Sequence, residues 1–343
     1  MKSERLLFRT RGGPTQGWGN VFRLASFASA CRDAGHEDIT FLAEGPSEVV
    51  TYLEQRGFQV TALADGIDLE LERGILRAYG SAHVSFVEML EITPERQELL
   101  RRHCERLVIF DDLCDNIYDA DLVVCGQSLP SHANQVLSSP ETRFLTGPEY
   151  FLCRPEFLPF ADRTRSFPEH VRKVLITLGG GAYDVGYLKA ALALRAFEPA
   201  LEATFVLGYG KTDLEARLHE ILPEAVVLEG VDDLEQKLWD CDVAITSAGY
   251  TKFEAALTQT PFLMMSAQWH QIPLAEGFAA RAGVNNLGYM AYVEPCEIIR
   301  GLREFASAEA RRIRTYRARS VVDGRGFERV QEAVFGRTPV PSS

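Results

Sequence analysis

The sequence predicts an α/β protein made of two Rossmann-like domains, each a parallel sheet with helices on both faces. Short apolar runs alternate with stretches of helical periodicity along most of the 343 residues. That length favours about two domains of roughly 150 residues each. A charged stretch with several prolines, at 155–170, interrupts the alternation near the middle and is typical of an interdomain linker. We therefore place the boundary near residue 165, with domains at 1–165 and 166–343.

The individual elements follow from hydrophobic periodicity. The strand candidates are 6–9, 39–43, 83–87, 107–110 and 122–124 in the first half, and 174–178, 204–207, 226–228, 243–246 and 262–265 in the second. The clearest helix has apolar residues from Val21 to Cys31 at helical spacing and stops before Gly35. A charged helical segment at 309–335 could pack back across the first domain.

Composition excludes several classes of protein. Hydrophobic residues make up 46% and charged residues 24%, as in a globular protein with a substantial core. A net charge of −12 argues against a nucleic-acid binder and against docking on anionic membranes. No apolar stretch is long enough for a transmembrane helix. The seven cysteines are scattered, and no secretory signal is seen, so a cytoplasmic location is expected.

A first glycine-rich turn, at 11–20, leads from the first strand into the first helix. Gly17 and Gly19 would let the backbone approach a ligand closely, and a helix N-terminus favours anions. The structural alternative is a tight turn in which Asn20 caps the helix. The spacing does not fit the dinucleotide-binding fingerprint.

A second glycine turn follows the strand at 174–178 and contains Gly180 and Gly181. Glycines at the carboxyl end of a strand suit the wall of a cleft where substrate or the other domain comes close. Asp184 could cap the next helix, which is the commoner role for such a residue.

A third turn follows the buried strand at 243–246 and consists of the small residues Ser247, Ala248 and Gly249. Its amides could hold a diphosphate without a metal ion. Thr251 and Glu254 have the spacing of a capping box, which is the structural role available to Glu254. The functional alternative is a carboxylate that accepts hydrogen bonds from ribose hydroxyls.

His270 and Gln271 follow the next strand and are expected at the same sheet edge, although a histidine in a loop is more often polar surface. Asp111 and Asp112 follow the strand at 107–110. Paired carboxylates can serve acid/base chemistry, and they also commonly cap a helix or solvate a loop. No cluster has the spacing of a metal site, and no P-loop or G-x-S-x-G motif occurs, so neither metal nor cofactor is expected.

With these segments in order, the chain resembles the PseG/SpsG group, the nucleotide-sugar hydrolases of pseudaminic acid biosynthesis, which are GT-B relatives of the glycosyltransferase MurG. The matching segments are Arg9 with G-W-G-N-V-F-R at 17–23, L-V-I-F-D-D-L at 107–113, L-T-G-P-E-Y-F-L-C-R-P-E-F at 145–157, S-A-G-Y-T-K-F-E at 247–254 with His270 and Gln271, and D-G-R-G-F-E-R-V at 323–330. The segments at 145–157 and 323–330 are the ones that narrow the resemblance to this group.

The resemblance implies a GT-B-like fold, in which two Rossmann-like domains face a central cleft. The N-terminal domain would be the acceptor and catalytic domain, the C-terminal domain would bind a UDP-sugar, and no cofactor would be needed. The implied nucleotide- and substrate-binding residues are Gly17, Gly19, Arg23, Gly180, Gly181, Ser247, Ala248, Gly249, Thr251, Glu254, His270 and Gln271. The implied catalytic candidates are Asn20, Glu88, Asp111 and Asp112.

One departure from the group bears on the chemistry. Asn20 stands where the group has its expected catalytic histidine, and an amide is not a general base near neutral pH. A second carboxylate of the group is absent after the strand at 83–87, and Glu88 is the nearest substitute. Three hypotheses follow: a hydrolase that uses Glu88, Asp111 or Asp112 as its base, a glycosyltransferase with a hydroxyl acceptor, and a non-catalytic binder of nucleotide sugars.

Overall fold

The computed structural model describes residues 4–13, 18–128, 133–179, 183–208 and 212–336. The chain divides into two compact units. Unit 1 comprises Met1–Arg154 and Arg325–Ser343, and unit 2 comprises Pro155–Gly324. Each unit is a parallel sheet with helices interleaved along the chain, so the predicted α/β class is confirmed.

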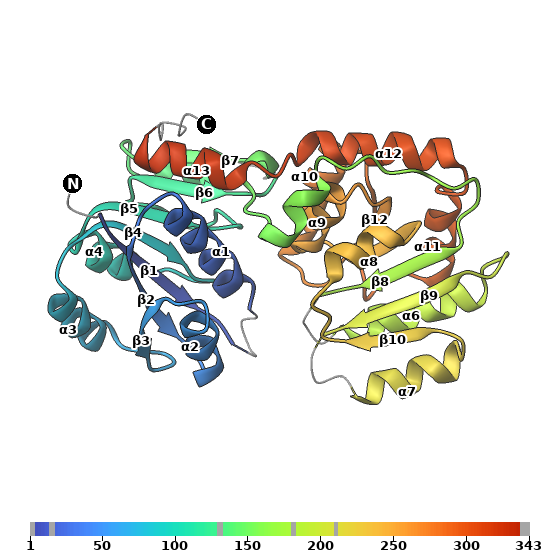
Figure 1. Ribbon diagram of the computed structural model, residues 1–343, viewed down its shortest axis with the longest axis horizontal. Helices are drawn as coiled ribbons and strands as arrows, with labels where there is room; N and C mark the ends of the chain where they lie inside the picture. The colour runs from blue at the N-terminus through green and yellow to red at the C-terminus, as the bar shows by residue number, and fades with distance from the viewer. Residues whose placement is uncertain (1–3, 14–17, 129–132, 180–182, 209–211, 337–343) are drawn as a thin grey trace. The chain divides into compact units, whose positions relative to one another are not determined.

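Unit 1 contains a seven-stranded sheet in the order β3-β2-β1-β4-β5-β6-β7, with every neighbouring pair parallel. Its strands are β1 (Arg5–Arg11), β2 (Asp38–Glu44), β3 (Gln59–Leu63), β4 (Ala82–Glu88), β5 (Cys104–Phe110), β6 (Leu122–Cys125) and β7 (Arg143–Thr146). Its helices are α1 (Gly19–Asp33), α2 (Ser47–Glu54), α3 (Leu69–Tyr79), α4 (Pro94–Arg101), α5 (Ala133–Leu137), the short η1 (Pro148–Tyr150) and α13 (Gly326–Phe335) (Figure 1).

Unit 2 contains a six-stranded parallel sheet in the order β10-β9-β8-β11-β12-β13. Its strands are β8 (Lys173–Thr177), β9 (Glu202–Leu207), β10 (Val226–Glu229), β11 (Val243–Ser247), β12 (Phe262–Ser266) and β13 (Asn285–Tyr289). Its helices are η2 (Pro155–Phe160), α6 (Asp184–Arg195), α7 (Thr212–Ile221), α8 (Leu234–Asp240), α9 (Thr251–Leu257), α10 (Gln271–Ala282), α11 (Pro295–Arg303) and α12 (Ala308–Val321).

Successive side chains of a strand point to opposite faces of the sheet, and both faces of these sheets are buried. In β1, Phe8 packs between Phe41 and Phe86 at ring-centroid distances of 5.0 and 4.8 Å on the face covered by α1 and α13. Its neighbour Leu7 belongs to the apolar cluster on the other face, with residues of α3 and α4. This arrangement explains why the strands of the core have nearly continuous apolar runs.

All the strand candidates are confirmed, and three strands lacked a signal. These are β3, β7 and β13, and each is an edge strand of its sheet. Edge strands are partly exposed, as the side chains of β13 are along its whole length, so they need no continuous apolar run. Every central strand was predicted, and β10 is the one predicted strand that lies at an edge.

The division into units differs from the expected boundary near residue 165, because the stretch at 155–170 is bound to unit 2. Arg165 Nη1 donates to the carbonyls of Leu238 and Thr258 at 3.2 and 3.3 Å, and Gln259 Nε2 donates to the Phe160 carbonyl at 3.3 Å. The compact unit therefore begins at Pro155.

The division also differs at the C-terminal end, where α12 and α13 belong to different units. In unit 2, α12 packs on α10 and α9. In unit 1, α13 lies beside β6 and β7 (Figure 1) and packs against η1. A Cβ on Gly326 would be 2.1 Å from the Phe151 carbonyl oxygen, so only glycine allows this approach. The return of the last segment to the first domain holds for α13 and not for α12.

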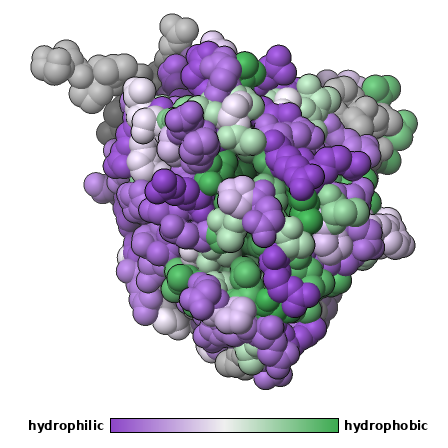
Figure 2. Space-filling model, turned by 90° about the vertical axis from the view of Figure 1, so that its right-hand side faces the viewer, coloured by the Kyte–Doolittle hydropathy of each residue, from purple (hydrophilic) through white to green (hydrophobic). Residues whose placement is uncertain are grey.

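The surface carries hydrophobic residues among a majority of polar ones. Figure 2 shows one face, on which green hydrophobic patches alternate with purple hydrophilic residues. Such scatter is ordinary, because polar surface never covers a protein completely. Among the helices that the structure describes, none combines the length and apolar character needed to cross a bilayer.

Candidate functional site

The sheet of unit 2 has a topological switch point between β8 and β11, because β9 and β12 lie on opposite sides of this pair. In open parallel sheets, ligands bind outside the carboxyl ends of the strands at such a point. The turns after the two strands meet there. A Cβ on Gly179, whose φ is +88°, would lie 3.7 Å from Ser247 Oγ. Gly180 and Gly181 lie outside the described residues.

The turn after β11 brings together three of the predicted binding residues. A Cβ on Gly249 would lie 3.4 Å from Ser247 Oγ and 3.7 Å from Gln271 Nε2, so the missing side chain leaves a space lined by two polar groups. Gln271 Oε1 accepts a hydrogen bond from the Ala267 amide at 2.8 Å, which fixes the direction of its carboxamide. The Ala248 amide donates to the Met265 carbonyl at 2.9 Å, so it serves the sheet.

Thr251 and Glu254 do not form the capping box that their spacing allowed. Helix α9 begins at Thr251 with Tyr250 as its N-cap residue, and within 250–257 no side chain caps the helix. Tyr250 has helical φ and ψ of −69° and −29°, which places Thr251 inside the helix instead of at its cap. Glu254, in the first turn of α9, is a carboxylate only 5% exposed.

His270 and Gln271 lie where β12 leads into α10, as predicted, but their surroundings differ. Gln271 faces the turn after β11, whereas His270 is exposed and its side chain does not cap α10. Trp269 stacks on Tyr289 with ring centroids 4.3 Å apart and is 61% exposed. Neither aromatic ring was predicted as part of the site. The only sign of this pair in the sequence was that Trp269 directly precedes the predicted residue His270.

Lys252 is the residue of this edge that sequence reasoning left out. Its side chain is fully buried, and Nζ donates to the carbonyls of Ala248 and Gly249 at 2.7 and 3.1 Å. A fully buried lysine is rare unless its charge is satisfied. Its position in a helix whose residues are otherwise mostly apolar was the only signal in the sequence.

In unit 1, the switch point lies between β1 and β4, since β2 and β5 lie on opposite sides of this pair. The prediction that Asn20 caps α1 is wrong. The Trp18 carbonyl accepts the first helical hydrogen bond, from the Phe22 amide at 3.0 Å, and the two rings pack 5.6 Å apart. Helix α1 therefore begins at Gly19, and Asn20 is its second residue, partly exposed. Gly17 lies outside the described residues.

One helical turn after Asn20, Arg23 joins two carboxylates from the ends of neighbouring strands. Its guanidinium donates to Glu88 Oε1 and to Asp112 Oδ1, each at 2.8 Å. Arg23 and Glu88 are 6% and 2% exposed, whereas Asp112 is 18% exposed. The structure thus assembles Arg23, Glu88 and Asp112 into one cluster at the switch point.

Glu88 is unusual within this cluster. Burial raises the pKa of its carboxyl to about 8, although the charge and hydrogen bonds of Arg23 oppose that rise. Its Oε2 is buried and has no hydrogen-bond partner among the described residues. Glu88 is therefore largely protonated at neutral pH, which disfavours it as a base there.

The two adjacent aspartates have different roles. Asp111 Oδ1 accepts from the amides of Leu113 and Cys114 at 2.9 and 3.1 Å, and Oδ2 accepts from Asn116 and from the Tyr118 hydroxyl. Burial raises the pKa of Asp111 while these hydrogen bonds lower it. Asp111 therefore holds the loop after β5, and Asp112 is the member that faces Arg23.

Arg9, which contributed to the resemblance, has a structural role. It is fully buried and pairs with Glu44 and with Glu72, the latter at 2.7 Å. Within the described residues, no group of His, Cys, Asp and Glu side chains gathers closely enough to hold a metal ion.

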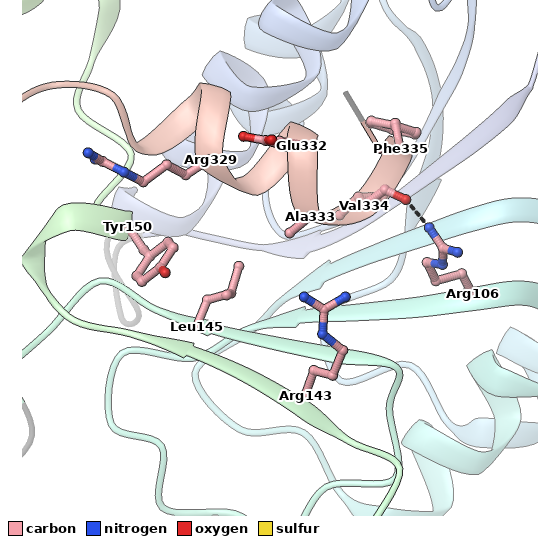
Figure 3. Close-up of a pocket in the computed structure, with 10 residues that line it drawn as sticks. Arg106, Arg143, Leu145, Tyr150, Arg329, Glu332, Ala333, Val334 and Phe335 are labelled. Atoms are coloured by element: carbon pink, nitrogen blue, oxygen red, sulfur yellow. Dashed lines mark hydrogen bonds between the residues drawn. The ribbon is translucent and has the colours of Figure 1, made fainter. Parts of the chain in front are cut away.

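A groove of about 770 Å³ lies in unit 1 between β5, β7 and α13, away from the carboxyl edge (Figure 3). Arg106 and Arg329 line it and donate to the carbonyls of Val334 and Glu149, the latter at 2.8 Å. Arg143 and Tyr150 point toward it. The two hydrogen-bonded arginines hold α13 against β5 and η1. The groove is the space that remains between α13 and the sheet.

The chain has relatives among known proteins, although no protein-family model matches it. It is 24% identical to the uncharacterized protein MJ1062 of Methanocaldococcus jannaschii over 318 residues, which are 88% of this chain and 64% of that protein. The chain thus spans less than two thirds of this relative. It is 25% identical to the spore coat polysaccharide biosynthesis protein SpsG of Bacillus subtilis over 329 residues, or 93% of this chain and 94% of SpsG.

Solved structures share the fold at low sequence identity. MurG of Acinetobacter baumannii has a TM-score of 0.69 at 12% identity and covers 97% of this chain and 100% of its own. HepE of Anabaena, solved in complex with UDP and glucose, has a TM-score of 0.63 at 14% identity, with coverage of 97% and 100%. The chain is therefore similar to SpsG along nearly its whole length and has the GT-B fold of MurG, as its sequence segments predicted.

Proposed function

We propose that this chain is a nucleotide-sugar-processing enzyme that cleaves the anomeric C–O bond of a UDP-sugar with water as the acceptor, in the synthesis of a surface glycan or nonulosonic acid. The observation that carries the proposal is the switch point of unit 2, where Gly249 leaves a space beside Ser247 and Gln271, with Glu254 in the next helix. The similarity to SpsG, a spore coat polysaccharide biosynthesis protein, and to HepE, which binds UDP and glucose, supports a polysaccharide pathway and a uridine nucleotide.

In this proposal unit 2 is the nucleotide-sugar domain. The diphosphate lies on the turn after β11, where the Ser247 hydroxyl and the Gln271 amide group can donate to its oxygens. Glu254 accepts hydrogen bonds from the ribose hydroxyls. Hydrogen-bond donors and positive charge at the diphosphate stabilise the negative charge that develops on UDP as it leaves, so no metal ion is needed.

Unit 1 is the catalytic domain in this proposal, and Asp112 is its base. It is the most exposed carboxylate of its cluster and accepts a hydrogen bond from Arg23. Asp112 takes a proton from water while the water oxygen bonds to the anomeric carbon. The bond from that carbon to the phosphate oxygen breaks, and its electron pair leaves with UDP. Asn20 orients the water or the sugar.

The first experiment measures nucleotide release from UDP-, GDP-, dTDP- and CMP-sugars without an acceptor, including UDP-2,4-diacetamido sugars. We expect steady UDP release from a UDP-sugar, well above the buffer blank. Glu254→Ala should abolish UDP binding and Glu254→Gln should weaken it, whereas Glu215→Gln on the exposed face of α7 should leave it unchanged. Unchanged affinity in both Glu254 variants would refute the site assignment.

A second experiment tests the base. Asp112→Asn should lower the rate of UDP release by roughly 10²–10⁴-fold with little change in UDP affinity. The control Asp119→Asn removes the same charge from a side chain that is 69% exposed, and it should change neither quantity. Full activity in Asp112→Asn would remove this residue from the mechanism.

The second candidate is a glycosyltransferase with the same donor site and a hydroxyl acceptor. It is favoured by Asn20, which lacks the basicity that water activation needs, and by the fold shared with MurG. UDP release that requires an added glycan or lipid acceptor would establish it. UDP binding without turnover under any acceptor would instead indicate a non-catalytic binder.

A further inference from the structure

Lys252 places a buried ammonium group against the backbone of the turn after β11. Its side chain is fully buried, with Nζ 4.4 Å from the centre of the Phe253 ring. Nζ donates to two successive carbonyls, those of Ala248 and Gly249. Burying an ammonium group costs free energy, which these hydrogen bonds and the aromatic ring partly offset.

The direction of these carbonyls determines the direction of the amides in the same turn. In a trans peptide, the C=O of one residue and the N–H of the next point in opposite directions. Because Nζ binds the carbonyls of Ala248 and Gly249, the N–H groups of Gly249 and Tyr250 point away from the ammonium. A carbonyl that accepts a hydrogen bond from a cation also polarises its peptide group, which makes the N–H a stronger donor.

We propose that Lys252 is a positioning residue for the diphosphate: it orients and polarises the amides of Gly249 and Tyr250 and supplies buried positive charge behind the turn. This inference rests on the proposed function, because it concerns the same site. Helix α9 has only seven residues, so its own dipole is a weak source of positive charge. Lys252 then does part of what a metal ion would do, without contact with the nucleotide.

The chain contains a matched control for this arrangement. Lys189 on α6 also donates from Nζ to two successive carbonyls, those of Met290 and Ala291 at 3.3 and 2.7 Å. Lys189→Met therefore removes a similar clamp from the loop after β13, in the same unit. A general effect on unit 2 of removing a lysine that binds two carbonyls should appear in both variants.

The experiment compares the affinities of UDP, UMP and uridine for wild type, Lys252→Met, Lys252→Gln and Lys189→Met by isothermal titration calorimetry. We expect Lys252→Met to weaken UDP binding by roughly 10- to 100-fold and uridine binding by less than about threefold, with UMP between them. Lys252→Gln keeps a hydrogen-bond donor for the carbonyls but removes the charge. Its losses of affinity should therefore be smaller, and again largest for UDP and smallest for uridine. Lys189→Met should leave all three affinities unchanged.

The outcomes separate this inference from the proposed function. Suppose that wild type binds UDP, and that the Lys252 variants lower the affinities for UDP and uridine by the same factor or change neither affinity. Lys252 is then only structural, and the inference is overturned. If Lys252→Met fails to fold, Lys252→Gln decides by the same comparison. If wild type binds no UDP, the proposed function fails and the inference fails with it.

Discussion

Each unit has a switch point at the carboxyl edge of its sheet, but different chemical groups occupy the two edges. In unit 1, charged side chains occupy the edge: Arg23 is paired with Glu88 and Asp112 in a mostly buried cluster. In unit 2, the edge is made of backbone and small residues, with Gly249 at its centre and the charge of Lys252 behind it. The first arrangement suits proton transfer, and the second suits the close approach of an anion.

This difference determines how each edge should respond to substitution. Removing the buried charge of Arg23 leaves its carboxylate partners uncompensated, so that change in unit 1 should cost stability. Filling a small space beside a backbone turn leaves the core untouched, so changes in unit 2 should cost binding and little stability. The following predictions test that contrast, from the largest expected effect on stability to the smallest.

Arg23→Met should lower the free energy of unfolding by about 3–5 kcal/mol above pH 8, because the variant must either bury an ionised Glu88 without its partner or bind a proton that the wild type has released. The loss should shrink at lower pH, since a protonated Glu88 needs no counter-charge. Urea denaturation measures this difference. Arg102→Met is the control, because its pair with Glu98 is exposed and should contribute less than about 1 kcal/mol.

Glu88→Gln should become relatively more stable than wild type as the pH rises. The folded chain keeps Glu88 neutral between the ordinary pKa of 4.5 and about 8, whereas the unfolded chain ionises it. The contribution of Glu88 to stability is thus complete below pH 4.5 and is lost as the pH rises through 8. The difference in unfolding free energy should grow by up to about 1.4 kcal/mol per pH unit across that range. A difference independent of pH would show that Glu88 is ionised throughout.

Gly249→Ala should change the free energy of unfolding by less than about 1 kcal/mol, because the new Cβ meets its nearest neighbours at ordinary contact distances of 3.4 and 3.7 Å. It should nevertheless weaken UDP binding at least about tenfold, since the methyl group occupies the space proposed for a phosphate oxygen. Denaturation and calorimetry on the same preparation check both expectations. A large loss of stability with unchanged UDP affinity would reverse the contrast between the two edges.

Sequence by itself determined the α/β class, the central strands and the turns that end at both switch points. Strands buried on both faces must be apolar, and glycine or small residues must stand where a backbone turns sharply at a sheet edge, so these features are local in the chain. Ser247 and Gly249 could be predicted for that reason, and Gln271 because it follows the next strand at the same sheet edge.

Only the tertiary structure decided which side chains act together. Arg23, Glu88 and Asp112 are far apart in the chain and meet because α1, β4 and β5 converge at one edge. The division between Asp111 and Asp112 depends on which carboxylate faces the loop and which faces Arg23. Arg165 and Arg329, which help to hold 155–170 on unit 2 and α13 on unit 1, donate to carbonyls that are far away in the chain. Such long-range hydrogen bonds leave no periodic pattern in the sequence, so folding alone reveals them.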